Sequence, residues 1–561
     1  MALLLSRAAR TCTASRLAGG RGSVRRYNSR DQLDRQLHEL QVLANTTEPA
    51  AQEHQFLRKS KIVCTIGPKV GNADDIAMLM AAGMNVARFN FSHGEYSWFE
   101  EVIGIIRDVK RQKKRADVAI ALDTKGPEIR TGHHAKGTPA GDPGFALPIA
   151  RGDELLFSAD PALADAGDGA SQYVDYPEIG TAVRVGGSLM VDDGLLEFVV
   201  TEAGDGWVRA EASNDGSLGE RKGVNLPGAA LTLPAVSAKD EADLAFGAAM
   251  GVDMVFASFV RKGEHVDDVR AALGGHPARV ISKIENLEGV QNFDDILARS
   301  DGIMVARGDL GIEIPAPKVF VSQKLLVAKC NLVGKPVICA TQMLESMVVN
   351  PRPTRAEVSD VANAVVDGAD AVMLSGETAK GAWPEASLRT MSSVVREAEA
   401  TMNEEYIADR QQIIMPHPCS SLEAVCAGAA KASHDQNASM LMLITETGEG
   451  PRLAAKYRPS VPIVACCSSE ATARACALLR GVIPIVIPWN SAEASDLITI
   501  DVKKVIQAAL ARVRAMGIVT SGRALVLHDS DISDGEEMSD WLLRLVDVDA
   551  SGPPRPIQSA M

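Results

Sequence analysis

Short β-branched or apolar runs alternate with amphipathic helical stretches along most of this chain. The runs cover residues 62–66, 85–91, 118–123, 254–259, 279–285, 302–306, 336–341 and 371–374. Stretches with helical apolar spacing, such as residues 74–82 and 96–112, separate most of these runs. Eight alternations of strand and helix predict an α/β protein built on a (β/α)8 TIM barrel.

One interval between the runs is too long for a single helix. About 100 residues between Arg130 and Leu233 carry Gly and Asp turns and alternating strands, with few helical patterns. Runs at 195–201 and 207–212 flank the turn at 203–206 and predict a β-hairpin. We therefore expect a barrel domain A at residues 59–132 and 232–400. An all-β lid, domain B, is expected at residues 133–231, inserted over the active site.

The remaining segments have a different character. After about residue 400, helical patterns at 421–434 and 471–479 alternate with strand patterns at 440–444, 463–466, 483–487 and 523–527. This alternation predicts a separate C-terminal α/β domain C at residues 401–548. The polar segment 28–58 predicts a leading helix, and the tail 549–561, with Gly and three Pro, predicts disorder.

The first 27 residues have the composition of a targeting segment. Seven arginines lie in the first 30 residues, and the first acidic residue is Asp31. An Arg-rich, acid-free and potentially amphipathic leader is typical of a mitochondrial transit peptide, and Arg25-Arg26-Tyr27 resembles a matrix-protease cleavage site. We predict import into the mitochondrial matrix. The alternative is a disordered basic arm on a cytoplasmic protein.

Composition excludes several classes of function. The chain of 561 residues has a formal net charge of −14, which does not predict a nucleic-acid or anionic-membrane surface. It has no apolar run of roughly 18 residues, so no transmembrane helix is expected. Nine cysteines without a Cys-x-x-Cys pair argue against a disulfide scaffold or a cysteine zinc site. Neither a P-loop nor a Gly-x-Gly-x-x-Gly dinucleotide fingerprint is present.

Polar and charged residues gather where the predicted strands end, which is where barrel enzymes place their active sites. Six strands end in such groups: Arg88, Asn90, Ser92 and His93; Asp123, Thr124, Lys125 and Arg130; Lys283 and Glu285; Arg307, Gly308 and Asp309; Thr341 and Gln342; Ser375 and Glu377. Any one of them alone has a structural explanation as a cap, a turn residue or an ion pair. Six coincident strand ends favour a catalytic face.

The types of these residues indicate phosphoryl transfer. Glu285 and Asp309 are hard oxygen ligands of the kind that hold Mg²⁺ while leaving positions for substrate. Side chains alternate along a strand, so Lys283 shares a face with Glu285 and can stabilise charge on a moving phosphoryl group. Arg88 can add a bidentate phosphate contact. The turn at 306–311 can receive a carboxylate or phosphate through its backbone N–H groups.

Two further sets of strand-end residues suggest other roles. Asn90, Ser92, Asp123 and Thr124 offer oxygens with only one formal charge, which suits a monovalent cation better than a second Mg²⁺. The hydroxyls of Thr341 and Ser375 are candidates for donating or relaying a proton.

At these residues the sequence resembles the pyruvate kinase family. The resemblance covers about residues 60 to 545. It rests on seven segments, which lie in the family's order: residues 84–94, 121–130, 222–228, 281–286, 304–311, 340–346 and 373–379. The activity implied is phosphoryl transfer between phosphoenolpyruvate and ADP, giving pyruvate and ATP. The resemblance also implies Mg²⁺ and K⁺ as cofactors and a homotetramer as the assembly.

The resemblance carries residue roles with it. It places the transferring phosphoryl group on Arg88 and Lys283, Mg²⁺ on Glu285 and Asp309, and the substrate carboxylate on Gly308, Asp309 and Thr341. It assigns K⁺ to Asn90, Ser92, Asp123 and Thr124, and the nucleotide to Asn90, His93, Arg130 and Lys222. Which of Thr341, Ser375 or a water chain protonates the enolate stays open.

Two other functions compete with this one. The first is a different Mg²⁺-enolate barrel enzyme, such as an aldol lyase that uses phosphoenolpyruvate. Such an enzyme does not need the nucleotide contacts or the inserted lid. The second is a catalytically inactive regulatory relative, which would require the loss of site residues. A coupled assay for pyruvate formation separates all three.

The chain departs from the family pattern in a regulatory loop. Many pyruvate kinases are activated by a sugar bisphosphate, which is gripped by a loop that resembles Thr-Lys-Ser-Gly-Arg-Ser. The matching residues 445–450 carry Glu446 and Glu449 at both cationic positions, and the loop at 528–537 carries five acids. We expect no activation by fructose 1,6- or 2,6-bisphosphate. Glu128, by contrast, matches the family members that depend on K⁺.

Overall fold

The computed structural model describes residues 40–41, 44, 58–113, 117–135, 146–415, 418–489, 502–519, 521–530 and 540–548. The chain divides into two units, residues 1–48 and 49–561. Everything below concerns the second unit. The predicted transit peptide and the tail at 549–561 lie outside the described residues, as does almost all of the predicted leading helix.

The predicted barrel is confirmed. Eight parallel strands close in the order β1-β17-β16-β15-β14-β13-β3-β2. Their bounds are β1 Lys61–Ile66, β2 Val86–Asn90, β3 Ala119–Asp123, β13 Met254–Ala257, β14 Arg279–Ile284, β15 Gly302–Ala306, β16 Val337–Ala340 and β17 Ala371–Leu374. Several runs continue one or two residues beyond the observed strand, because their last residues already turn away from the ladder to form the site.

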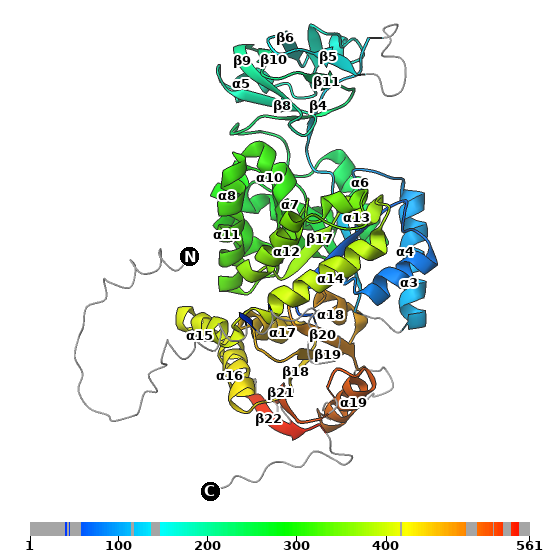
Figure 1. Ribbon diagram of the computed structural model, residues 1–561, viewed down its shortest axis with the longest axis vertical. Coiled ribbons are helices and arrows are strands. Elements are labelled where there is room, and N and C mark those ends of the chain that lie inside the picture. Colours follow the sequence, from blue (N-terminus) through cyan, green and yellow to red (C-terminus); the bar gives the residue numbers. More distant parts are fainter. Residues whose placement is uncertain are drawn as a thin grey trace, which may run out of the picture. The chain divides into compact units, whose positions relative to one another are not determined.

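Helices cover the outside of the barrel strands (Figure 1). They are α3 Ala73–Ala82, α4 Tyr96–Lys113, α6 Ala238–Ala249, α7 Gly263–Ala272, α8 Leu287–Gln291, α9 Phe293–Arg299, α10 Arg307–Glu313, α11 Ala316–Val333, α12 Arg355–Asp367, α13 Gly376–Ala379 and α14 Pro384–Ala400. Their ends follow local chemistry. Asn72 caps α3 by accepting from the Asp75 N–H, and Gly83 ends it at φ 109°.

Two layers of apolar side chains hold the barrel together. Apolar residues such as Val63, Ala121 and Met304 fill its interior. A larger cluster, including Phe89, Phe99 and Leu326, packs between the strands and the surrounding helices. Because side chains alternate along each strand, the same run supplies both layers. The end of each strand is therefore held rigidly where the polar residues begin.

The inserted segment forms the predicted β-rich domain. A seven-stranded sheet has the order β4-β12-β8-β9-β10-β6-β7, and β11 pairs with β5. The strands are β4 Ile129–Arg130, β5 Leu147–Ile149, β6 Glu154–Ser158, β7 Ser171–Tyr173, β8 Ser188–Val191, β9 Leu196–Gly204, β10 Trp207–Ala212, β11 Gly216–Leu218 and β12 Gly223–Asn225. The expected hairpin is β9 and β10, which pair antiparallel. One short helix, α5 Ile179–Ala182, was not expected in this domain.

The C-terminal domain is a five-stranded mixed sheet with helices. Its elements are α15 Glu404–Ile414, α16 Ser421–Asp435, β18 Met440–Thr445, α17 Glu449–Lys456, β19 Ile463–Cys467, α18 Glu470–Ala475, β20 Val482–Val486, α19 Val502–Ala515, β21 Arg523–Ser530 and β22 Asp540–Asp547. The strand order is β20-β19-β18-β21-β22. The predicted helix at 471–479 is shorter than expected, and β22 was not predicted.

Candidate active site

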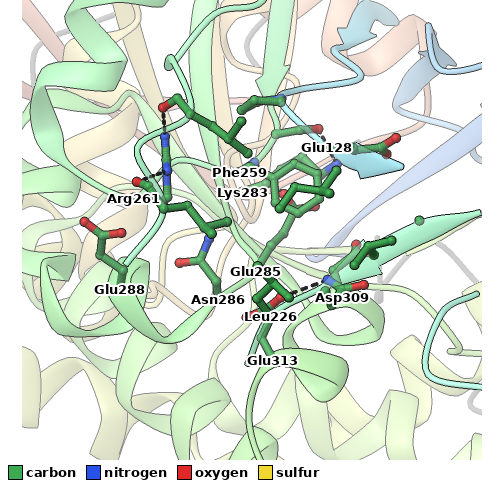
Figure 2. A pocket seen from close by; sticks show the side chains of 18 of the residues that line it. Glu128, Leu226, Phe259, Arg261, Lys283, Glu285, Asn286, Glu288, Asp309 and Glu313 are labelled. Atoms are coloured by element: carbon green, nitrogen blue, oxygen red, sulfur yellow. Dashed lines mark hydrogen bonds and ion pairs between the residues drawn. The ribbon is translucent and has the colours of Figure 1, made fainter. Parts of the chain in front are cut away.

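A cleft of about 820 Å³ opens at the carboxyl ends of the barrel strands. Its walls come from the strand ends of the barrel and from the lid residues on either side of Lys222. Figure 2 shows Lys283, Glu285, Asp309 and Glu313 in this cleft. The sequence-predicted residues that line it are Arg88, Asn90, Ser92, His93, Arg130, Lys222, Lys283, Glu285 and Asp309.

Lys283 is the centre of a buried charge network below the cleft. It leaves the end of β14, and its Nζ lies 3.0 Å from Asp123 Oδ1, 3.0 Å from Glu285 Oε1 and 2.7 Å from Ser258 Oγ. Burial opposes the charge on this amine. The carboxylates of Asp123 and Glu285 outweigh that effect and raise the pKa of Lys283. The side chain is therefore a fixed cation that faces the cleft.

Asp123 lies between two cations. Its Oδ2 accepts from Arg88 Nε at 2.5 Å, and its Oδ1 accepts from Lys283. Burial alone would raise the pKa of this carboxyl, but Arg88 and Lys283 lower it below its usual range. Arg88 also donates to Thr65 Oγ1 at 2.8 Å. Asp123 thus stays ionised and orients both cations toward the same point.

Glu285 and Asp309 supply the negative side of the site. Glu285 is only 1% exposed, and its Oε2 accepts from the Phe259 N–H at 2.5 Å. Burial raises the pKa of Glu285, and the nearby Asp309 carboxylate raises it further, against the opposing effect of Lys283. Asp309 lies in the first turn of α10. Two carboxylates in a desolvated place carry a negative charge that Lys283 alone does not balance.

This donor set fits Mg²⁺. The two carboxylates are hard oxygen ligands, and the unbalanced charge is of the sign that a divalent cation neutralises. Across the described part of the chain, no group of three or more His, Cys, Asp or Glu side chains could form a metal cage. Glu285 and Asp309 would therefore hold the ion, with substrate and water oxygens completing its coordination.

Oxygens at the ends of β2 and β3 lie side by side. Asn90 and Asp123 are register partners, and the Phe91 N–H donates to the Asp123 carbonyl at 3.0 Å. The Asn90 side chain accepts from the Ser92 N–H at 3.1 Å. Thr124 and Asp123 are buried behind the cleft wall. The single carboxylate in this group is already paired with Arg88 and Lys283, so the group carries little net charge.

Thr341 and Gly308 hold the turn that carries Asp309. The Gly308 N–H donates to Thr341 Oγ1 at 2.7 Å. A Cβ at Gly308 would lie 3.3 Å from that oxygen, so glycine permits the close approach. Thr341 has a φ of 70°, a strained conformation for a β-branched residue. Thr341 does not line the cleft, and neither does Ser375, the other candidate proton donor.

Two strand-end residues turn out to be structural. Arg307 donates to both carboxylate oxygens of Asp360 at 2.7 Å, and to the Thr341 carbonyl at 2.9 Å. Glu377 is fully buried and accepts from the N–H groups of Leu344 at 3.0 Å and Ser375 at 2.7 Å. Both fix the loops that follow β16 and β17 instead of facing the cleft.

The lid brings further cations to the cleft. Arg130 in β4 pairs with Glu128, and its Nη1 donates to the Arg221 carbonyl at 2.8 Å. Lys222 Nζ lies 3.0 Å from Asp192 Oδ2. Both side chains line the cleft and remain partly exposed.

Sequence reasoning missed the contribution of the fourth barrel strand. Ser258 Oγ donates to the Thr124 carbonyl at 2.6 Å and accepts from Lys283. Phe259 adopts a φ of 53°, which aims its N–H at Glu285. The strand ends in Ser-Phe, without a charge. The hydroxyl of Ser258 was the available signal, of the same kind as those of Ser92 and Thr341.

The chain matches two family models. Residues 57–388 match the barrel domain of pyruvate kinase, and residues 423–540 match its alpha/beta domain. The "Pyruvate kinase" of Kluyveromyces lactis is 48% identical over 473 residues, which are 84% of this chain and 92% of that protein. The Homo sapiens protein "Pyruvate kinase PKLR" is 46% identical over 457 residues, which are 80% of this chain and 78% of that protein.

A solved structure resembles the whole described fold. The crystal structure of a pyruvate kinase from Cryptosporidium parvum has a TM-score of 0.81 and 38% sequence identity to this chain. It covers 90% of this chain, which in turn covers 98% of it.

Proposed function

Because this chain belongs to the pyruvate kinase family, we propose that the charge network around Lys283 carries out its phosphoryl transfer. The enzyme converts phosphoenolpyruvate and ADP into pyruvate and ATP in glycolysis. The observation that carries the residue assignment is the convergence of Lys283, Arg88, Glu285 and Asp309 on one cleft at the strand ends. With the family established, neither a lyase nor an inactive relative is needed to explain the site.

The proposed chemistry follows from the fixed charges. Lys283 and Arg88 bind the phosphoryl oxygens of phosphoenolpyruvate and hold the phosphorus for in-line attack by a terminal phosphate oxygen of ADP. The bond from phosphorus to the enolate oxygen breaks, and the enolate then takes a proton at its methylene carbon. Mg²⁺, when held by Glu285 and Asp309, neutralises charge on the phosphoryl and carboxylate oxygens.

The other substrate contacts come from the helix α10 turn and the lid. We propose that the N–H groups of Gly308 and Asp309, at the start of α10, receive the substrate carboxylate, with the Gly308 N–H exchanging its bond to Thr341 Oγ1 for the carboxylate. The nucleotide phosphates are bound by Arg130 and Lys222 of the lid and by Asn90 and His93 at the end of the barrel strand β2.

A coupled assay tests the function. The purified chain should form pyruvate from phosphoenolpyruvate only when ADP and Mg²⁺ are both present, and chelation of the metal should abolish turnover. Pyruvate formation without ADP would identify a phosphatase. No pyruvate under any of these conditions would contradict the proposed function.

We infer that K⁺ is the second cation. Asn90, Ser92, Asp123 and Thr124 provide oxygens at neighbouring strand ends, and Asp123 is already neutralised by two cations. A site of such low charge favours a monovalent ion over a second divalent one.

The apolar surface of α11 supports the expected homotetramer. Phe320, Val321, Leu325, Leu332 and Val333 expose large apolar side chains on this helix. In the C-terminal sheet, β22 is an edge strand that exposes Leu542 and Leu543. Such surfaces fit contacts with further copies of the same chain, because they would otherwise remain in water.

Location in the mitochondrial matrix remains a proposal that rests on the Arg-rich leader. Among the described residues, no helix has the length and apolar character to cross a bilayer. A reporter fused to residues 1–60 should enter mitochondria and be cleaved near Tyr27. A reporter that stays in the cytosol would contradict the proposal.

A further inference from the structure

A second cavity of about 570 Å³ lies where the barrel meets the C-terminal domain. It is at the opposite end of the barrel from the cleft. Ile120 lines it near the start of β3, whereas Asp123 ends the same strand at the active site. Asp253 lines it immediately before β13, whereas Ser258 follows that strand. The two cavities are therefore separate.

Five cations line this second cavity. Arg107, Lys110 and Arg111 come from α4, Arg474 comes from α18, and Arg512 comes from α19. The lining contains two acids, Asp253 and Glu470. The whole chain has a net charge of −14, so a local excess of cations runs against its average composition. This excess of positive charge makes the cavity attractive to an anion.

The two acids neutralise only one of the five cations. Arg474 Nε lies 2.5 Å from Asp253 Oδ1, and its Nη1 lies 3.1 Å from Glu470 Oε2. Arg111 pairs with Asp108, an exposed neighbour one turn back on α4. Within the part of the chain that the structure describes, the remaining three side chains form no ion pair with a carboxylate, although Asp253 and Glu470 lie near enough to act on the charge of Lys110.

Those three side chains keep unused donors. Arg107 donates through one terminal nitrogen to the carbonyls of Met250 and Gly251, and Lys110 donates to the carbonyl of Val118. Within the described residues, Arg512 has no hydrogen-bond acceptor or ion-pair partner and is exposed. Lys110 is only 7% exposed, and burial lowers its pKa to about 8. An anion in the cavity would offset that loss of solvation.

We propose that this cavity binds a small organic anion that carries two phosphate groups, or one phosphate and one carboxylate. The guanidinium group of arginine can donate two parallel hydrogen bonds to a phosphate or a carboxylate, and a buried lysine ammonium adds a point charge. Two anionic groups are needed because the cations stand on two sides, on α4 of the barrel and on α18 and α19 of the C-terminal domain. Ile120 and Val486 provide an apolar wall for the carbon skeleton that joins the two anionic groups.

Binding there would tie two domains together. The Arg474–Asp253 ion pair already joins α18 to the residue before β13. A ligand held by Arg107 or Lys110 on one side and Arg512 on the other would add a second connection across the same boundary. Because it binds the folded state alone, it should also raise the apparent melting temperature.

The test uses the full-length enzyme and two phosphate probes. Inorganic pyrophosphate and orthophosphate are titrated calorimetrically into metal-free protein. The pocket variant is Arg111→Glu/Arg512→Glu, which changes two exposed side chains and should keep wild-type turnover. The control, Arg151→Glu/Arg184→Glu, reverses two exposed cations of the lid. The net charge of the protein therefore changes equally in both.

We expect pyrophosphate to bind more tightly than orthophosphate, and the pocket variant to lose at least about tenfold in pyrophosphate affinity at this site. The control should bind as the wild type does. Pyrophosphate binding that is unchanged in the pocket variant would place the ligand in the catalytic cleft alone and overturn the proposal. Equal loss in both variants, equal affinity for the two probes, or no binding at all would also overturn it.

Discussion

The formal charges of the side chains at the active site do not sum to zero. Arg88 and Lys283 contribute two positive charges, and Asp123, Glu285 and Asp309 contribute three negative ones. One Mg²⁺ at Glu285 and Asp309 would change this sum from −1 to +1, which would attract an anionic substrate. Lys283 is the one residue in direct ion pairs with two of these carboxylates. Its replacement should therefore have the largest effect.

Lys283→Met should abolish turnover. Loss of a cation that stabilises transition-state charge in a desolvated site costs about 10²- to 10³-fold or more in kcat. Metal binding at Glu285 and Asp309 should persist, which Mn²⁺ titration by electron paramagnetic resonance can measure. Lys318→Met, at an exposed position, is the matched control. More than about a tenth of the wild-type kcat in Lys283→Met would disprove the role.

The enzyme should be activated by K⁺ much more strongly than by Na⁺. Glu128 pairs with Arg130 and lies 3.7 Å from Lys125, so it adds an acid beside the oxygens of β2 and β3. Glu128→Lys places a fixed cation there and should reduce the dependence on K⁺. Initial rates in chloride salts of K⁺, Na⁺ and tetramethylammonium measure the effect. Full activity in tetramethylammonium would contradict it.

At the scale of elements, two of the charged contacts between the barrel and the C-terminal domain carry predictions. The first element is β1, where Lys61 Nζ donates to the Val482 carbonyl at 2.7 Å. The second is α17, where Arg452 donates to the Val333 and Gly334 carbonyls at the end of α11. The contact of Lys61 predicts how stability depends on pH, and the contacts of α17 predict how the enzyme responds to a sugar bisphosphate.

Lys61 should make stability rise with pH in the alkaline range. Burial lowers its pKa in the folded state to about 8, whereas an unfolded Lys titrates near about 10.4. Between these values the unfolded chain binds the extra proton, so raising the pH favours the folded state. The apparent melting temperature of the wild type, minus that of Lys61→Met, should increase from pH 8 to pH 10. A difference in melting temperature that stays constant between pH 8 and pH 10 would disprove the predicted role of Lys61.

Fructose 1,6-bisphosphate should not activate the enzyme. Glu449 at the start of α17 pairs with Arg452, with Nη2 to Oε1 at 2.5 Å and Nε to Oε2 at 2.8 Å. Arg452 is therefore already neutralised, and Arg279, which donates to the Thr447 carbonyl at 3.3 Å, is paired with Asp301. A phosphate would meet Glu446 and Glu449. The matching acids at 531–537 lie outside the described residues.

The measurement is a titration of this bisphosphate at sub-saturating phosphoenolpyruvate. Half-saturation by phosphoenolpyruvate should not move. A several-fold drop in the half-saturating concentration would contradict the prediction. Glu446→Lys/Glu449→Arg restores the cations of the family loop and shows whether the site responds to charge.

At the scale of the whole molecule, assembly should depend on the exposed face of α11. Val321 and Leu325 are 53% and 44% exposed and lie one turn apart. Val321→Asp/Leu325→Asp places two charges in the expected contact between copies and should lower the mass measured by light scattering. Leu195→Asp, an exposed lid position, should leave the mass unchanged. A wild-type enzyme that is monomeric would contradict the expected tetramer.

Local sequence patterns were sufficient to predict the barrel, the lid and the C-terminal domain. Strand and helix periodicities are local, and a closed parallel barrel places every strand end on one face. Lys283, Glu285 and Asp309 were found in this way, because each lies within three residues of the end of its strand. The edge strand β22 was missed, since its pairing with β21 depends on a partner and not on a strong pattern of its own.

Only the tertiary structure decided which of these side chains touch one another. Asp123 lies between Arg88 and Lys283 because the register of β2, β3 and β14 brings three distant segments together. Closure of the barrel also brings Arg307 to Asp360. Arg307 is therefore a structural residue, although the sequence places it at a strand end. The second cationic cavity also needs α4, α18 and α19 side by side. Periodicity reports which face of an element is buried, but the partner of a buried charge is set by long-range packing.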